Sequence, residues 1–200
     1  MRTTTVRIAL IAATASLASV SAWAQSTLYF QSQPGDFIGQ GQTATYTDID
    51  GSFGANGGGT RRIDVAFTSV GFSWFLNFEA PEGQVLGAGM YEGATRWPFQ
   101  SPTRPGLDVS GDGRGCNTSN GRFLVLEATY DVSGEVMSFA ADFEQHCEGV
   151  TPALYGAIRF NSALPFVPRL SVGGAAAVEG PSGAGTVSYT HLTLPTKRIV

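Results

Sequence analysis

Hydrophobic and polar residues alternate with a period of two along much of this chain. Ile63, Val65 and Phe67 alternate with less apolar residues, and the same pattern runs through 72–79. Successive side chains of a strand point to opposite faces, so a period of two is typical of a strand with one buried face. No segment of ten or more residues keeps a helical period. The pattern predicts strands at 27–31, 43–47, 63–68, 72–79, 90–95 and 154–160.

The segments between these strands are rich in glycine and proline, of which the chain has 26 and 10. Many short strands joined by such turns are typical of β-sandwiches and jelly rolls. We therefore predict an all-β domain, built as a two-sheet antiparallel β-sandwich or a jelly-roll-like fold, with one disulfide.

A hairpin is expected where 122–130 and 135–146 flank the turn Asp131-Val-Ser-Gly134, whose glycine can adopt a positive φ. If Tyr130 faces Glu135, one face of the hairpin carries most of the large apolar side chains and should form core. That face would hold Leu124, Leu126 and Ala128 opposite Ala141, Phe139 and Met137, with Phe143 further along.

The same register brings the two cysteines close together. Cys147 would face position 118, which is two residues from Cys116. Two cysteines brought so near in an exported chain should form a disulfide. A reactive thiol pair is disfavoured, because their spacing does not resemble C-x-x-C.

Both ends of the chain differ in character from the middle. Residues 1–24 have a basic start, an apolar core and an A-x-A site, which together predict a secretory signal peptide. Residues 187–200 resemble a translated sequencing adapter and are excluded from the fold. We expect a β-sandwich domain of unknown function over 25–168, a further segment over 169–186, and an extracellular or cell-surface location.

The charge of the part between these ends limits its partners. Residues 25–185 contain eight arginines, no lysine and sixteen acidic residues, a net charge of 8 − 16 = −8. Such a balance disfavours nucleic acid and anionic membranes, which reward clustered positive charge. We therefore expect no nucleic-acid partner and no membrane insertion of the mature domain. His146 is the one histidine of this range, which removes most catalytic triads and multi-histidine zinc sites.

A short acidic segment has part of a calcium-loop pattern. Asp108, Ser110 and Asp112 have the one-three-five spacing of oxygen ligands, and Gly113 occupies the sixth position. The twelfth position is Ser119, where a bidentate glutamate belongs. The alternative is a Gly/Asp turn between strands. Calcium is thus the one cofactor considered for the chain.

Two further groups of side chains are candidates for function. Glu127, Asp142 and Glu144 fall on one face of the hairpin, where a carboxylate pair could hydrolyse a glycan. Tyr91, Trp97 and Phe99 belong to a proline-rich segment that could stack on sugar rings or anchor a partner. The alternative for the aromatic group is a loop held over the core by its own side chains.

Four segments, 33–41, 113–117, 143–149 and 152–162, resemble an uncharacterised β-rich domain of exported bacterial proteins over about 26–163. This resemblance implies an architecture and a setting but no active site.

The segment 168–183 is similar to the opening strand of a Calx-β repeat, a calcium-binding sandwich module, with Val178-Glu-Gly180 as its specific part. The resemblance implies that Glu179 is a calcium ligand. A Gly/Ala/Ser linker is the alternative for 169–186.

Taken together, these observations predict a non-catalytic extracellular binding or structural module of a modular bacterial surface protein. Its partner would be a glycan or another surface protein. The alternative is an extracellular polysaccharide hydrolase that uses a carboxylate pair.

Overall fold

The computed structural model describes residues 24–57 and 59–166. The described residues all belong to one compact unit. The predicted signal peptide, apart from its last residue, lies outside the described residues, as do the 169–186 segment with Glu179 and the adapter-like 187–200. Over the residues that the structure describes, no helix is long and apolar enough to cross a membrane.

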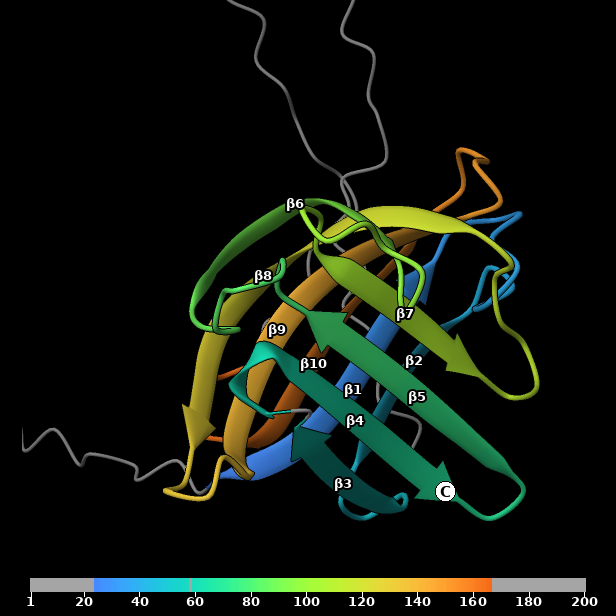
Figure 1. The fold of residues 1–200 in the computed structure, drawn as a ribbon. Helices are drawn as coiled ribbons and strands as arrows, with labels where there is room; N and C mark the ends of the chain where they lie inside the picture. Colours follow the sequence, from blue (N-terminus) through green and yellow to red (C-terminus); the bar gives the residue numbers. More distant parts are fainter. Residues whose placement is uncertain (1–23, 58, 167–200) are drawn as a thin grey trace, which may run out of the picture. The chain divides into compact units, whose positions relative to one another are not determined.

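Ten strands form one sheet in the order β2-β1-β10-β9-β8-β6-β7-β5-β4-β3 (Figure 1). Hydrogen-bonded neighbours are antiparallel except β6 and β7, which run parallel at Thr95–Gly106 and Arg96–Leu107. A 3-10 helix, Gly59–Arg61, precedes β4. The strands are β1 (Gln25–Ser32), β2 (Thr43–Thr47), β3 (Ser52–Gly57), β4 (Arg62–Ser69), β5 (Phe72–Glu79), β6 (Gly89–Arg96), β7 (Gly106–Gly111), β8 (Ser119–Tyr130), β9 (Val136–Cys147) and β10 (Leu154–Ser162).

The sheet curls until its two halves pack face to face, with β1, β9 and β10 behind β4 and β5 in Figure 1. The ring centroids of Phe30 on β1 and Trp74 on β5 are 4.4 Å apart, although five strands lie between β1 and β5 in the sheet. The ring centroids of Phe78 on β5 and Phe139 on β9 are likewise 5.2 Å apart. An open, twisted sheet of about ten strands curls because each strand is rotated relative to its neighbour.

The all-β class is confirmed, and the layers differ from the expected arrangement. We predicted a two-sheet antiparallel sandwich or a jelly-roll-like fold, and the two packed layers belong to one curled, mixed sheet of ten strands around a single buried core. Every strand that the alternation predicted is present. β3 and β7 were missed, because β3 has the glycine-rich sequence SFGANG and β7 contains the segment that resembles a calcium loop.

The β8–β9 hairpin is present, but its predicted register was wrong by one residue. Phe123 pairs with Phe143, and Val125 pairs with Ala141. The predicted core positions Leu126 and Met137 therefore point outward and are 38% and 56% exposed. The turn is one residue longer than expected, since the Asp131 amide donates to the Glu135 carbonyl and Tyr130 pairs with Val136. A one-residue slip reverses the faces of a strand, and bulges at Leu126 and Met137 adjust the pairing further.

The predicted disulfide between Cys116 and Cys147 is confirmed, with their Cα atoms 5.2 Å apart. Both cysteines are buried. Cys147 pairs with Ser119, so the loop that carries Cys116 turns back toward the open end of the hairpin. The bridge therefore ties the loop after β7 to the end of β9.

A buried side chain completes one edge of β7. β6 pairs with β7 only as far as Leu107. The next amide and carbonyl of β7 that point toward the β6 side, those of Val109, therefore have no strand beside them. The Val109 amide donates to Gln145 Oε1 at 2.8 Å, and Gln145 Nε2 donates to the Val109 carbonyl at 2.8 Å. The Gln145 side chain thus takes the place of a peptide group in the sheet.

Candidate functional site

The outward face of β4, β5 and β7 gathers polar and aromatic side chains from three neighbouring strands. The register places Asp64, Asn77 and Asp108 in one row across the strands, with Ala66, Phe75 and Ser110 in the next. We call this face the outer platform; it consists of Asp64, Ala66, Thr68, Ser73, Phe75, Asn77, Asp108 and Ser110. Along β5 it runs from Ser73 to Asn77, which corresponds to roughly 13 Å.

The polar row is held by hydrogen bonds and ion pairs. Asn77 Nδ2 donates to Asp64 Oδ1 at 2.8 Å. Arg62 Nη2 lies 2.9 Å from Asp64 Oδ2, and Arg96 Nε lies 3.6 Å from Asp108 Oδ1. Burial raises the pKa of the Asp108 carboxyl, and the nearby Arg96 partly offsets that rise. The row therefore presents fixed hydrogen-bonding groups rather than freely rotating ones.

A loop between β6 and β7 covers one end of this face. Its Gln100 side chain lies against Gly106, where an added Cβ would come within 2.8 Å of the amide carbon of Gln100. The loop thus packs directly on the strand, and a larger residue at 106 would displace the Gln100 side chain. The Glu82 amide also donates to the Pro102 carbonyl at 2.7 Å, which ties the loop to the segment after β5.

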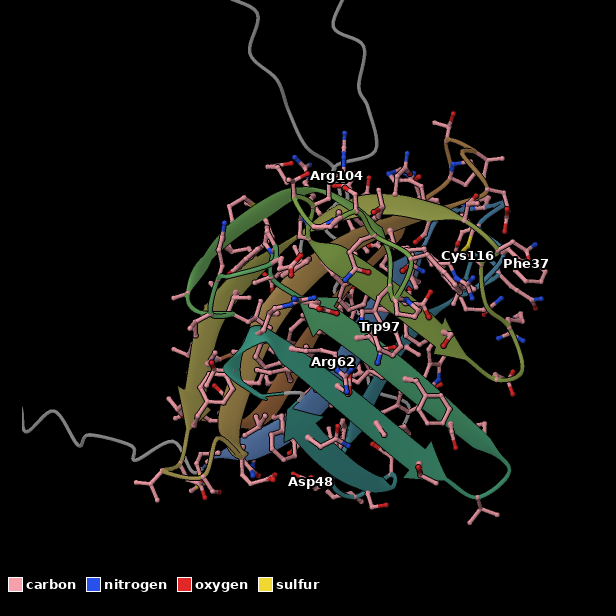
Figure 2. The ribbon with its side chains drawn as sticks, viewed as in Figure 1. Phe37, Asp48, Arg62, Trp97, Arg104 and Cys116 are labelled. Atoms are coloured by element: carbon pink, nitrogen blue, oxygen red, sulfur yellow. A yellow bond between two sulfur atoms is a disulfide. The ribbon has the colours of Figure 1, made fainter. Side chains whose placement is uncertain are left out.

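A cleft of about 320 Å³ lies between this loop and the adjoining ends of β4 and β5. Its lining includes Arg61, Arg62, Glu79, Trp97, Gln100 and Arg104. Arg61 and Glu79 form an ion pair within it. The Arg62 guanidinium lies over the Trp97 ring, 5.2 Å from its centroid (Figure 2). This contact holds the half-buried Trp97 at the junction of the cleft and the outer platform.

Two polar atoms that line or border the cleft are buried without a hydrogen-bond partner. They are Arg62 Nε and Gln100 Oε1. Buried polar groups are almost always paired, so orphaned ones in a cleft mark a place where a ligand or water could bind.

The predicted aromatic group is only partly brought together. Tyr91 stacks on the buried Phe123 with ring centroids 4.7 Å apart, and its hydroxyl donates to the Gly87 carbonyl at 3.1 Å. Tyr91 is thus a packing residue. Phe99 is 73% exposed, with Arg96 over its ring. Of the three, Trp97 alone lines the cleft.

Phe75 was missed as a candidate. It is 51% exposed on the outer platform, beside a second, shallower depression of about 660 Å³. The signal for it was present in the sequence. Phe75 occupies a polar position in the alternation of 72–79, so a strand with a buried opposite face must point this ring outward.

The positions of the calcium-like motif lie in different surroundings. Asp108 and Ser110 belong to β7, and Asp112 lies in the following turn, where it forms an ion pair with Arg114 at 3.0 Å. Within 24–57 and 59–166, no group of three or more His, Cys, Asp or Glu side chains is arranged to hold a metal ion.

Each hairpin carboxylate considered for the hydrolase alternative has a hydrogen-bond or ion-pair partner. Glu127 accepts hydrogen bonds from Ser138 and Ser162, and Asp142 forms an ion pair with Arg159. Glu144 contacts Arg122 and His146 at 2.8 and 3.1 Å. Burial raises the pKa of Glu144, but these two partners outweigh it, so the net shift is downward. A lowered pKa is the opposite of what a general acid needs.

No protein family, curated protein or solved structure matches this chain. The functional argument therefore rests on the geometry of the outer platform and the cleft.

Proposed function

We propose that the domain is a non-catalytic binding module of an exported bacterial protein, and that the outer platform and cleft bind a glycan chain. The observation that carries this proposal is the placement of Trp97 beside the polar row. Its ring lies next to Arg62, which contacts Asp64, which in turn accepts a hydrogen bond from Asn77.

This combination suits the chemistry of a sugar. The C–H face of a sugar ring packs on an aromatic ring, while its hydroxyls exchange hydrogen bonds with carboxylates and amides. Phe75 offers a second ring further along the same face. At roughly 13 Å, the platform is long enough to contact more than one sugar ring.

The disulfide supports the extracellular part of the proposal. Disulfides persist in oxidising compartments and are rare in the bacterial cytosol. The resemblances to an exported bacterial domain and to a Calx-β repeat, which brings the expectation of calcium, remain part of the proposal.

The hydrolase alternative is the weaker one. Glycoside hydrolysis needs one carboxyl held protonated and a second that is free to act as base or nucleophile. Among the described residues, the hairpin carboxylates are each paired with arginine, histidine or serine. A binding module needs no such pair.

The test is a glycan array followed by affinity electrophoresis with the full chain and three variants. We expect Trp97→Ala and Asn77→Ala each to weaken retention by about tenfold, the equivalent of about 1.4 kcal/mol. Trp97→Phe should keep part of the binding, because it keeps a ring at the same place.

Phe37→Ala is the matched control. Phe37 is 54% exposed, and Figure 2 shows it near Cys116, away from Trp97. All variants should keep the wild-type circular dichroism spectrum. Retention that survives both Trp97→Ala and Asn77→Ala, or the release of shortened glycans by the wild type, would overturn the proposal.

A further inference from the structure

The cleft beside Trp97 carries an excess of positive charge in an otherwise acidic domain. Residues 24–166 contain seven arginines and fifteen acidic residues, a net charge of 7 − 15 = −8. The cleft lining holds three of these arginines, Arg61, Arg62 and Arg104, against two glutamates, Glu79 and Glu82. The local sign is therefore opposite to that of the domain.

The three arginines differ in whether they have a carboxylate partner. Arg62 is paired with Asp64, and Arg61 reaches a single oxygen of Glu79 through both Nε and Nη2. Arg104 has no carboxylate partner within the part of the chain that the structure describes. Its Nη1 donates to the Gly93 carbonyl at 3.1 Å, which leaves other guanidinium donors available.

A guanidinium with donors left over, as in Arg104, suits a planar anion. A guanidinium presents parallel N–H groups that match the two oxygens of a carboxylate, and such charge-assisted hydrogen bonds are stronger than neutral ones. The buried, unpartnered Gln100 Oε1 can accept a hydrogen bond from a neighbouring hydroxyl. Trp97, on the same cleft, supplies the face on which a ring packs.

We propose that the cleft recognises an acidic sugar, a uronic acid residue within the glycan chain. The sugar ring lies on Trp97, and its carboxylate contacts Arg104 and Arg61. This inference rests on the proposed glycan-binding function, because it names the kind of sugar that the same surface selects. The negative charge of the rest of the domain disfavours non-specific binding of polyanions, so selection depends on this local contact.

The experiment compares polymers that share a backbone and differ in charge. The full chain is titrated with polygalacturonate and with its fully methyl-esterified form, and with hyaluronan and its carboxyl-reduced form. Dextran and dextran sulfate report on non-specific attraction to charge. We expect at least one acidic polymer to bind about tenfold more tightly than its neutral counterpart, with weaker binding as salt is raised.

Arg104→Gln should remove most of this preference, whereas Arg122→Gln should leave it intact. Both variants lose one positive charge, but Arg122 lies on the β8–β9 hairpin, paired with Glu144. Each variant is checked by circular dichroism. Trp97→Ala should weaken binding to the acidic and neutral forms alike.

The outcomes separate the two proposals. Equal binding of acidic and neutral forms, lost in Trp97→Ala, overturns the acidic-sugar inference and leaves the glycan-binding function standing. Equal losses in Arg104→Gln and Arg122→Gln, or dextran sulfate binding as tight as that of the uronates, also overturns the inference. If the protein binds no polymer of this panel and no glycan on the array, both the acidic-sugar inference and the glycan-binding function are overturned.

Discussion

Replacing Gln145 by leucine should destabilise the domain strongly, although Gln145 makes no ion pair. Its side chain is 1% exposed and supplies the partner of both backbone groups of Val109. Leucine has a similar size but can neither donate nor accept a hydrogen bond. The substitution therefore leaves one N–H and one C=O of β7 buried without partners.

The magnitude follows from these two groups. A buried polar group that loses its partner costs about 1–3 kcal/mol, so the pair costs about 2–6 kcal/mol. A domain of this size is stable by about 5–15 kcal/mol in total. The variant should unfold at a temperature roughly 5–20 °C lower than the wild type.

Urea and thermal unfolding of the full chain, followed by circular dichroism, measure this loss. Gln84→Leu is the matched control, since Gln84 lies exposed in the connection between β5 and β6. Its melting temperature should stay within about 2 °C of the wild-type value, because most exposed substitutions change stability by less than about 0.5 kcal/mol.

Gln145→Glu gives a second test of the same reasoning. A glutamate carboxylate can accept from the Val109 amide but cannot donate to the Val109 carbonyl, and its charge is buried. The protonated carboxyl can do both. The deficit of this variant relative to the wild type should therefore shrink as the pH falls from 7 toward about 4, near the ordinary pKa of glutamate. A Gln145→Leu loss no larger than that of Gln84→Leu would refute the argument.

Two further predictions concern the covalent bridge and the acid sensitivity of the domain. The Cys116→Ala, Cys147→Ala double variant should lose about 3–4 kcal/mol of stability, because the bridge closes a loop with a sequence separation of 31; urea titration checks this, and an unchanged midpoint would contradict it. Arg122 and His146 lower the pKa of Glu144 despite its partial burial, so Glu144 adds stability above its unfolded pKa that is lost as the pH falls through its lower folded value. Glu144→Gln should consequently be less stable than the wild type at pH 7, by a difference that shrinks as the pH falls below about 4, and a difference that stays constant down to the acidic end would disprove this linkage.

Local patterns in the sequence were sufficient for the strands with strict alternation and for one crosslink. β4 and β5 could be predicted because Ile63, Val65, Trp74 and Leu76 repeat every second residue, and that period has one structural meaning. The disulfide needed only an approximate register, since an error of one residue still leaves Cys116 near the end of β9. The same error was enough to reverse the expected faces of β8, because side-chain direction changes at every residue.

The candidate site was harder to predict, because its residues come from segments far apart in the chain. Trp97 was found from its aromatic, proline-rich surroundings. Asp64 and Asn77 become neighbours when β4 pairs with β5, but Asp108 joins them only when β7 pairs with β5, a pairing that skips β6. The arginines of the cleft come from β4, its preceding 3-10 turn and the β6–β7 loop.

The sequence by itself therefore determined that this domain is built of strands with one buried face, because burial of alternate residues is a local property of the chain. The tertiary structure alone decided the order of the strands, the curl that joins two layers into one sheet, and the side chain that completes β7. These depend on non-local pairing. The curvature of a strand is set by its neighbours in the sheet, and its backbone hydrogen bonds are completed by segments far along the chain, as those of Val109 are by Gln145, more than thirty residues away.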